Sequence, residues 1–540
     1  MKLSSVAKLA GVAFASALVL AGCGSNSSSK PAKKSITWMQ ISSLTTMDLS
    51  KVTDLIAAQT INNTNEGLLR MSTNSKVVPG VAKNYTISKD GKTWTFNLRK
   101  SKWSDGSAVT AKDFVYSWRR TLAPKTASQY AYIFDHIKNA NAVNAGKMPT
   151  SKLGVKAEGK YKLVVTLNRP QSYFKFLVAQ AYFAPQKESY VKKYGSKYGT
   201  TAKALAYNGP YILKGWNGTN DTWQIVKNKN YWDKKRVKLD EVKFTTIKDP
   251  STGLNQYQSG KLDVATLSGQ QVKNYKNNKE FASRKIAATW YLEMNQKKIP
   301  FFKNKNIRKA ISLAIDRKEL TNDVLADGSI PAKGFVASNM AYHNGKDFAD
   351  EAAVKDAVSS NLTEAKKYWA KGLKETGKKN VTFTLNADDT DSGKKTAEYI
   401  QSCLNKLPGM KIQNQNLPYK TRLARSASRD FDMVLSGWTG DFPDPITFLT
   451  LMSTGNAYND GQWSNKQYDT LVKNAEGKDA NNVDKRWDDM VKAEKLLVNE
   501  EGVVPLYQQV TPQLVKSKVK NIKFYPTAPV WDWSYVSLSK

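Results

Sequence analysis

The chain has 540 residues, 40% hydrophobic and 24% charged, and its 83 Lys and Arg outnumber 46 Asp and Glu to give a formal net charge of +37. A chain of this length can bury a large core and suggests two or three domains. So basic a composition is typical of nucleic-acid-binding proteins, but the bases are spread along the chain and form neither a zinc-finger pattern nor a basic zipper. We therefore expect no nucleic acid partner, and the charge favours attraction to an anionic cell envelope.

The N-terminus predicts export. Lys2 and Lys8 mark a short basic start, and the small apolar residues that follow are too few for a membrane span of about 20 residues. The run ends in Leu-Ala-Gly-Cys, which resembles the bacterial lipobox, so we expect residues 1–22 to be a signal peptide and Cys23 to carry a lipid anchor. Residues 23–33, rich in Ser and Lys, would form a flexible tether. An ordinary secretion signal with an incidental cysteine is the alternative.

Strand and helix patterns alternate along the rest of the chain. The alternation in "TWTFNLR" (93–99) predicts a half-buried strand, and Thr110 and Asp113 stand at capping-box spacing at the start of an amphipathic helix over 110–122. The continuous apolar run "FDMVLSGW" (431–438) predicts a strand buried on both faces. Further strands are expected at 162–167 and 242–247, and further helices at 306–320 and 361–373. This mixture predicts an α/β fold with mixed sheets.

Catalytic and metal-binding patterns are missing from the sequence. The two histidines, His136 and His343, lie far apart and have no neighbours at metal-ligand spacing. The "GKT" at 91–93 lacks the preceding glycine of a phosphate loop. Asp441 and Asp444 are the only attractive local pair for acid–base chemistry, and they lie in a loop broken by prolines. We therefore expect no enzyme, no metal site and no cofactor. Apart from Cys23, the only cysteine is Cys403, so no intramolecular disulfide is expected once the first is acylated.

Two stretches depart from the basic composition. Residues 430–465 contain five acidic residues and no Lys or Arg, although a stretch of this length would carry roughly five or six at the average of the chain. Residues 36–69 contain three acidic residues and a single base, Lys51. The acidic residues are Asp430, Asp432, Asp441, Asp444 and Asp460 in the first stretch and Asp48, Asp54 and Glu66 in the second. Both stretches are therefore candidates for a functional surface.

A series of segments, in order along the chain, resembles one known family. They are "NEGLL", "VVPGVAKNYTISKDGKTWTFNLRKSKWSDGSAVTAKDFVYSWRR", "NGPYILKGW", "LEMNQKKIPFFKNKNIRKAISLAIDR", "SGWTGDFPDPITFL" and "VPLYQQVTPQLVKSKVKNI". From about residue 36 to its end, the chain is thereby similar to the oligopeptide-binding proteins of bacterial ABC importers, which are extracytoplasmic solute-binding proteins. The resemblance implies a two-lobed fold of the periplasmic-binding-protein type II, in which hinged lobes close on the ligand, with an extra third domain.

The same resemblance implies where the domains begin and end. Domain I would be discontinuous, and domains II and III would each be one continuous segment. The expected ranges are 34–65, 188–294 and 505–540 for domain I, 66–187 for domain II and 295–504 for domain III.

The resemblance also implies a binding site. In the family, the strand and loop that follow Leu435 face the cleft, and the strand pairs with an extended peptide as an added strand would. Asp441 would take the α-ammonium of the peptide, because a cation buried in a closed cleft needs a carboxylate. The other implied site residues are Ser436, Gly437, Trp438 and Thr439 from the strand and Tyr130 from domain II. Packing in the core is an equal alternative for the two aromatic residues.

This site would explain the two base-poor stretches. A lysine beside Asp441 would compete for its carboxylate, so a peptide-binding wall should lack bases. Residues 36–69 also line the cleft in the family, and we therefore expect them to meet residues 430–465. The alternative is that Asp441 only caps a turn before Pro443. No Arg or Lys stands out for a C-terminal carboxylate, so the sequence does not indicate a peptide length.

The resemblance implies a monomeric receptor, lipid-anchored on the outer face of the cell membrane, that captures oligopeptides and passes them to the permease subunits of an ABC transporter. A surface adhesin that uses its basic body to bind anionic cell-wall or host polymers is the alternative from another class. Within the family, a signalling peptide or another small solute is an alternative ligand.

Overall fold

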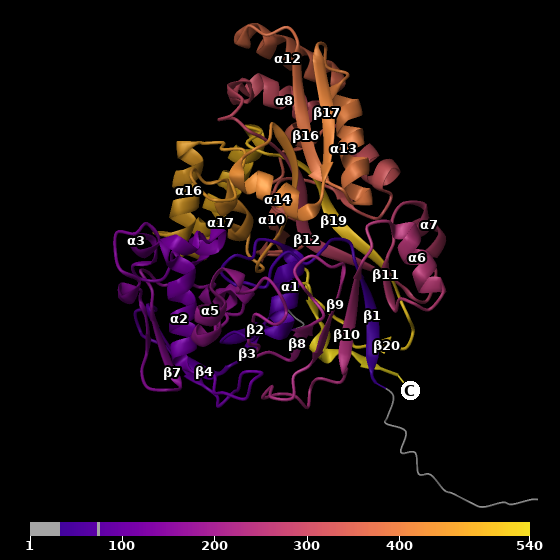
Figure 1. Ribbon diagram of the computed structural model, residues 1–540. Helices are drawn as coiled ribbons and strands as arrows, with labels where there is room; N and C mark the ends of the chain where they lie inside the picture. The colour runs from indigo at the N-terminus through magenta and orange to yellow at the C-terminus, as the bar shows by residue number, and fades with distance from the viewer. Residues whose placement is uncertain (1–32, 73–75, 540) are drawn as a thin grey trace, which may run out of the picture. The chain divides into compact units, whose positions relative to one another are not determined.

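The computed structural model describes residues 33–72 and 76–539, so the predicted signal peptide, Cys23 and nearly all of the predicted tether lie outside the described residues. The chain from Lys34 onward forms one compact unit with an α/β fold, as predicted (Figure 1). Within the described ranges, no helix is long and apolar enough to cross a membrane.

The main element of the unit is an eleven-stranded mixed sheet. Its strands are β1 (Ser35–Gln40), β8 (Tyr211–Lys214), β9 (Thr222–Lys227), β10 (Glu241–Thr246), β11 (Val264–Thr266), β12 (Phe281–Met294), β13 (Ile330–Pro331), β16 (Val381–Asp388), β17 (Met410–Leu417), β18 (Met433–Thr439) and β19 (Val504–Val515). They lie in the order β17-β16-β18-β12-β19-β11-β1-β10-β9-β8, and β13 pairs with β19 beside this path. β1 is parallel to β10 and β11, and β16 is parallel to β17 and β18, whereas the other pairs are antiparallel.

A separate four-stranded antiparallel sheet has the order β4-β5-β7-β6. Its strands are β4 (Ala82–Ile87), β5 (Thr93–Leu98), β6 (Val155–Ala157) and β7 (Lys162–Thr166). Trp94 and Phe96 of β5 are buried, which confirms the predicted half-buried strand. Thr110 and Asp113 form the predicted capping box before α2 (Ala111–Leu122). Four two-stranded sheets pair β2 (Leu69–Met71) with β3 (Val77–Pro79), β14 (Tyr342–His343) with β15 (Lys346–Asp347), β20 (Val519–Lys520) with β23 (Ser537–Leu538), and β21 (Lys523–Phe524) with β22 (Trp531–Asp532).

The helices include α1 (Leu55–Thr64), α3 (Ala140–Asn144), α4 (Phe174–Leu177), α5 (Glu188–Tyr194), α6 (Pro250–Gln258), α7 (Gln270–Tyr275), α8 (Lys305–Ala314), α9 (Arg317–Glu319), α10 (Phe348–Glu351), α11 (Lys355–Val358), α12 (Leu362–Thr376), α13 (Asp391–Leu404), α14 (Tyr419–Ser428), α15 (Ile446–Leu449), α16 (Lys466–Glu476) and α17 (Val483–Asn499). Around β16 and β17, α8, α12 and α13 pack their apolar faces into one core (Figure 1). Cys403 lies buried and free in α13.

The predicted helix over 306–320 is wrong at its C-terminal end. α8 stops at Ala314, and the carboxylate of Asp316 accepts hydrogen bonds from the main-chain N–H groups of Lys318 (2.9 Å) and Glu319 (3.1 Å). An aspartate in this position caps a new helical turn, so the apolar periodicity continued across a break that the capping side chain imposes.

The longest strands, β12 and β19, lie next to each other in the middle of the large sheet. β12 pairs on its other edge with the whole of β18, from Ala288 opposite Thr439 to Met294 opposite Met433. β16, in contrast, pairs with β18 only at Met433 and Val434. Met433 to Ser436 are all buried, as predicted. From Leu435 onward, the edge of β18 that faces away from β12 has no strand beside it within the described sheet.

Candidate functional site

The open edge of β18 forms one wall of a cavity with about 800 Å³ of space not filled by protein atoms, part of which opens to solvent. Four residues of this wall are the predicted Ser436, Gly437, Trp438 and Thr439. The predicted Tyr130 and Asp441 line the same cavity. Thus the structure brings all six residues predicted to contact the ligand together around one space.

Both base-poor stretches meet at this cavity, which confirms that prediction. The first stretch contributes Asp441, Tyr458, Asp460 and the wall residues of β18. The second contributes Thr53, Asp54, Leu55 and Ala58 from the start of α1. The remaining walls come from Gln129, Tyr182, Tyr291, Tyr419, Arg422, Leu423, Ser426, Ala427 and Ala528.

Asp441 is buried with few partners for its charge. Its side chain accepts hydrogen bonds from the hydroxyls of Tyr130 (3.4 Å) and Thr447 (3.3 Å), and no ion pair reaches it among the described residues. The Nε2 group of Gln180 donates to its main-chain carbonyl over 2.6 Å, which fixes the loop. Burial raises the pKa of the Asp441 carboxyl to about 7, since neither hydroxyl compensates for the lost hydration. A cation with N–H donors would supply what this carboxylate lacks.

The turn-capping alternative belongs to Asp444 instead. The carboxylate of Asp444 accepts from the main-chain N–H of Ile446 over 3.0 Å and forms a two-pronged ion pair with Arg486, at 2.8 and 2.9 Å. No main-chain N–H donates to the Asp441 carboxylate in the described part of the chain. Asp444 therefore has a structural role, in contrast to Asp441.

Aromatic side chains crowd the cavity beside Asp441. The ring of Tyr130 stacks on that of Tyr182 with 3.8 Å between centroids and lies parallel to that of Trp438 at 6.0 Å. Tyr458 packs edge-on against Trp438 at 4.9 Å. The indole Nε1 of Trp438 and the hydroxyl of Tyr458 are buried without a hydrogen-bond partner. Buried polar groups are rarely left unsatisfied, so these two groups are available to a ligand.

The structure adds residues that sequence reasoning missed. Asp460 is 7% exposed, one of its carboxylate oxygens has no hydrogen-bond partner, and burial raises its pKa to about 7. Its place in the base-poor stretch was the available signal. Arg422 of α14 lies in the same wall and is held by Asp388 at 2.9 and 3.2 Å. Nothing in the sequence distinguishes this arginine from the other arginines of the chain.

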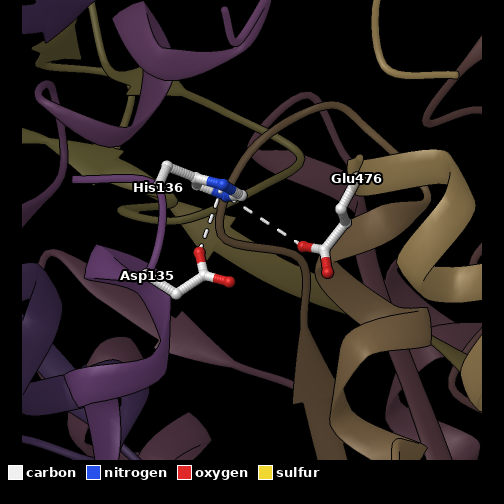
Figure 2. A group of neighbouring side chains, drawn as sticks. All are labelled: Asp135, His136 and Glu476. Atoms are coloured by element: carbon white, nitrogen blue, oxygen red, sulfur yellow. Dashed lines mark ion pairs between the residues drawn. The ribbon is translucent and has the colours of Figure 1, made fainter. Parts of the chain in front are cut away.

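A second cavity, with about 680 Å³ of space not filled by protein atoms and partly open to solvent, lies on the other side of Asp441, which is the one described residue that lines both. Asp135, His136 and Glu476 also line it, and one donor atom from each lies within 4.8 Å of the others (Figure 2). These are the residues that could hold a metal ion, although the ring nitrogens of His136 already contact Tyr173 (2.9 Å) and Gln171 (3.3 Å). Sequence spacing missed this cluster because Glu476 comes from a distant segment.

Comparison with known proteins identifies the family. Residues 76–460 match the family model described as bacterial extracellular solute-binding proteins, family 5 Middle. The chain belongs to this family. The dipeptide-binding protein of Lactococcus lactis subsp. cremoris is 36% identical to this solute-binding protein over 549 residues, covering 98% of this chain and 99% of the relative.

Solved structures of similar proteins agree with the fold. Listeria monocytogenes OppA bound to peptide matches with a TM-score of 0.90 and 38% identity, covering 94% of this chain and 100% of that one. The murein tripeptide-binding protein MppA of Escherichia coli matches with a TM-score of 0.85 at 29% identity, covering 94% and 99%. The unliganded open form of MppA gives only 0.62, also at 29% identity, covering 94% and 98%. The solute-binding protein described here thus has the type II periplasmic-binding-protein fold, in an arrangement closer to that of the peptide-bound relative than to that of the open form.

Proposed function

We propose that this protein is a membrane-anchored receptor that captures oligopeptides outside the cell and delivers them to an ABC transporter for uptake. The observation that carries the proposal is the position of Asp441, a buried carboxylate without a counter-ion at the end of a strand whose other edge is open to a cavity. The α-ammonium of a peptide would pair with Asp441, and its extended backbone would bond to the edge of β18 beyond Val434.

Closure of two lobes on the peptide is part of the proposal. We propose domain I as 34–65, 188–294 and 505–540, domain II as 66–187 and domain III as 295–504. Contacts between the last two already converge on the site, because Tyr130 and Gln180 reach Asp441. A ligand that contacts both domains would favour the closed form, since it can touch both of them at once only when the lobes are closed.

The location follows from the N-terminal pattern. We propose that Cys23 carries the lipid anchor, that residues 23–33 tether the body, and that the protein works as a monomer at the outer face of the membrane. The family description as extracellular supports the side of the membrane. The proposed role is binding without catalysis and without a cofactor; the Lactococcus and Escherichia relatives reported above are named as binding proteins, and the Listeria one is bound to peptide.

Native mass spectrometry of the body from residue 34 tests this function. Peptides that co-purify should leave on mild denaturation and rebind one to one after refolding. Asp441→Ala should abolish rebinding, whereas Asp430→Asn, an exposed acidic residue of the same base-poor stretch, should not. A refolded protein that ignores a mixed peptide library would refute peptide capture.

The net charge of +37 supports a second candidate role, retention of the protein on anionic cell-wall polymers. Binding through exposed charges is screened over about 8–10 Å near physiological ionic strength. Adhesion to an anionic polymer should therefore fade as salt is raised, while peptide held in the closed cavity should stay bound.

A further inference from the structure

We propose that the second cavity binds a cationic side chain of the ligand, so that the protein favours peptides whose first residue is lysine or arginine. This inference rests on the proposed function, because it places the α-ammonium of the same peptide on Asp441. It concerns the carboxylates of Asp135 and Glu476, which the peptide backbone would not use (Figure 2).

The position of the second cavity determines which residue of the peptide would enter it. Asp441 separates the two cavities, so an ammonium group bound there has its own side chain nearest to the second one. The side chain of Tyr173 connects the neighbour of Asp441 to the cluster of Asp135, His136 and Glu476. Tyr173 stacks on Phe442, the neighbour of Asp441, at 5.2 Å, and its hydroxyl lies 2.9 Å from Nε2 of His136 and 3.4 Å from Glu476.

The two carboxylates that line the second cavity have no ion pair with a lysine or an arginine among the described residues. Their only ion pairs among the described residues are with His136, at 3.2 Å for Asp135 and 4.0 Å for Glu476. Burial lowers the pKa of the His136 imidazole, which favours its neutral form. Two arginines lie near Glu476, but neither forms an ion pair with its carboxylate in the described part of the chain: Arg169 donates to the main-chain carbonyl of Glu476, and Arg486 is paired with Asp444. Burial raises the pKa of the Glu476 carboxyl to about 8 although both arginines lower it, so a cationic group of the ligand would stabilise its charged form.

The cluster also has more acceptors than donors. The side-chain oxygen of Gln171, a residue only 3% exposed, has no hydrogen-bond partner, and its amide nitrogen lies 3.3 Å from His136. A neutral histidine offers a single N–H to these oxygens. The missing component is therefore a positively charged group with several N–H donors, which describes an ammonium or a guanidinium.

A metal ion fits this place less well than a cationic side chain. Both ring nitrogens of His136 are already within hydrogen-bond distance of protein groups, so an ion would have to displace one of them. The second cavity also extends beyond the three residues of the cluster and opens to solvent, so a lysine or arginine side chain could enter it. Zinc binding at this cluster would therefore overturn the proposal.

The test compares peptides that differ only in their first residue. Isothermal titration calorimetry would measure the affinities of X-Ala-Ala and X-Ala-Ala-Ala-Ala, with lysine, arginine, ornithine, norleucine or glutamate at X. We expect lysine and arginine to bind roughly tenfold more tightly than norleucine, which keeps the four-carbon chain of lysine but lacks its ammonium group. Ornithine, one methylene shorter than lysine, measures the reach of the site.

Variants connect this preference to the cluster. Glu476→Gln keeps the shape of the side chain and should reduce the lysine-to-norleucine ratio to near one. Asp135→Asn should reduce it partly, and Asp430→Asn should leave it as in the unaltered protein. Each variant is also titrated with Zn²⁺ after treatment with EDTA.

Each alternative result has a distinct meaning. Equal affinities for lysine and norleucine, or a preference that survives Glu476→Gln, would overturn the inference and leave peptide capture standing. One-to-one Zn²⁺ binding that depends on Glu476 would make the cluster a metal site and overturn it as well. A protein that binds none of the peptides would refute both the inference and the proposed function.

Discussion

Buried and half-buried carboxylates in this protein fall into two sets with opposite surroundings. Asp48, Asp388 and Asp444 each accept two hydrogen bonds from one arginine, namely Arg120, Arg422 and Arg486. Asp441 and Asp460, in the cavity wall, have no such partner, and burial raises their pKa values to about 7. Asp441 and Asp444 are three residues apart in one loop, so the difference comes from what surrounds each of them.

The comparison distinguishes structural charge from charge reserved for a ligand. Paired ions in the interior are costly to break, because removal of one partner leaves an uncompensated charge. An unpaired buried carboxylate is already uncompensated, so its removal should not lower the free energy of unfolding and should weaken only the affinity for the ligand. Stability and affinity should therefore respond in opposite directions at the two aspartates of this loop.

The largest expected effect is on stability at the paired aspartate. Asp444→Ala leaves Arg486 buried without its partner and should lower the free energy of unfolding by about 3 kcal/mol. Urea denaturation followed by tryptophan fluorescence measures this change. Asp430→Ala, on the surface, is the matched control and should change stability by no more than about 0.5 kcal/mol. A loss at Asp444 as small as at Asp430 would contradict the structural role.

At the unpaired aspartate the main effect should be on affinity. Asp441→Asn preserves size but removes the charge, so peptide affinity should fall roughly thirtyfold, which corresponds to about 2 kcal/mol. The free energy of unfolding of the empty protein should stay the same or rise, because a buried charge is removed. Calorimetry with a co-purified peptide and urea denaturation measure the two quantities. A variant that binds normally but unfolds easily would reverse the assignment.

The dependence on pH should show the same charge. Because the folded pKa of Asp441 is raised to about 7, the folded protein binds one more proton than the unfolded chain between roughly pH 4 and pH 7. Its contribution therefore makes the empty protein less stable as pH rises through this window. Peptide binding should tighten over the same range, until the peptide amine loses its proton near about pH 8. Asp441→Asn should remove the contribution of this carboxyl to the pH dependence of stability and to the pH dependence of peptide affinity. If the pH profile of affinity stays the same in this variant, the ammonium role is contradicted.

The smallest expected effect is at Tyr458. Its hydroxyl is buried in the cavity without a partner, so Tyr458→Phe removes nothing that the folded empty protein uses. We expect stability to be unchanged and peptide affinity to fall about threefold, the loss of one modest hydrogen bond. Tyr468→Phe is the control, because Tyr468 does not line the cavity and its hydroxyl donates a 2.5 Å hydrogen bond to the carbonyl of Leu449. It should lower stability and leave affinity alone.

Much of this arrangement could be predicted from the sequence, because local patterns carry it. The alternation around Trp94, the capping box at Thr110 and the apolar run into β18 are all local, and the structure has them as predicted. Bases are absent from 430–465 and scarce in 36–69. We interpreted both features as the mark of a shared ligand-binding surface, and the two stretches do line one cavity.

Other parts depend on contacts between distant segments and left no local trace. Glu476 reaches His136 only because α16 packs near the turn that carries Asp135, and Arg422 enters the cavity wall only because α14 lies beside β16. An arginine or glutamate on a helix reads as solvent-exposed in so charged a sequence. The end of α8 was missed for the opposite reason, since one capping aspartate overrides an apolar pattern that continues past it.

The pairing of β12 with β19 has a consequence for how binding specificity can be exchanged between relatives. Leu292, near the end of β12, lies opposite Val504 at the start of β19, so the intervening chain, which adds β13, β16, β17 and β18 to the large sheet, begins and ends at neighbouring points. Recombination at these two points would replace that whole segment without rethreading the rest of the protein. Asp441, Asp460 and Glu476 would travel together as a cassette, while Tyr130 and His136 would stay behind. One exchange would thus replace the three acidic residues of the cavities together, and the chimera would take its ligand preference from the protein that donated the segment.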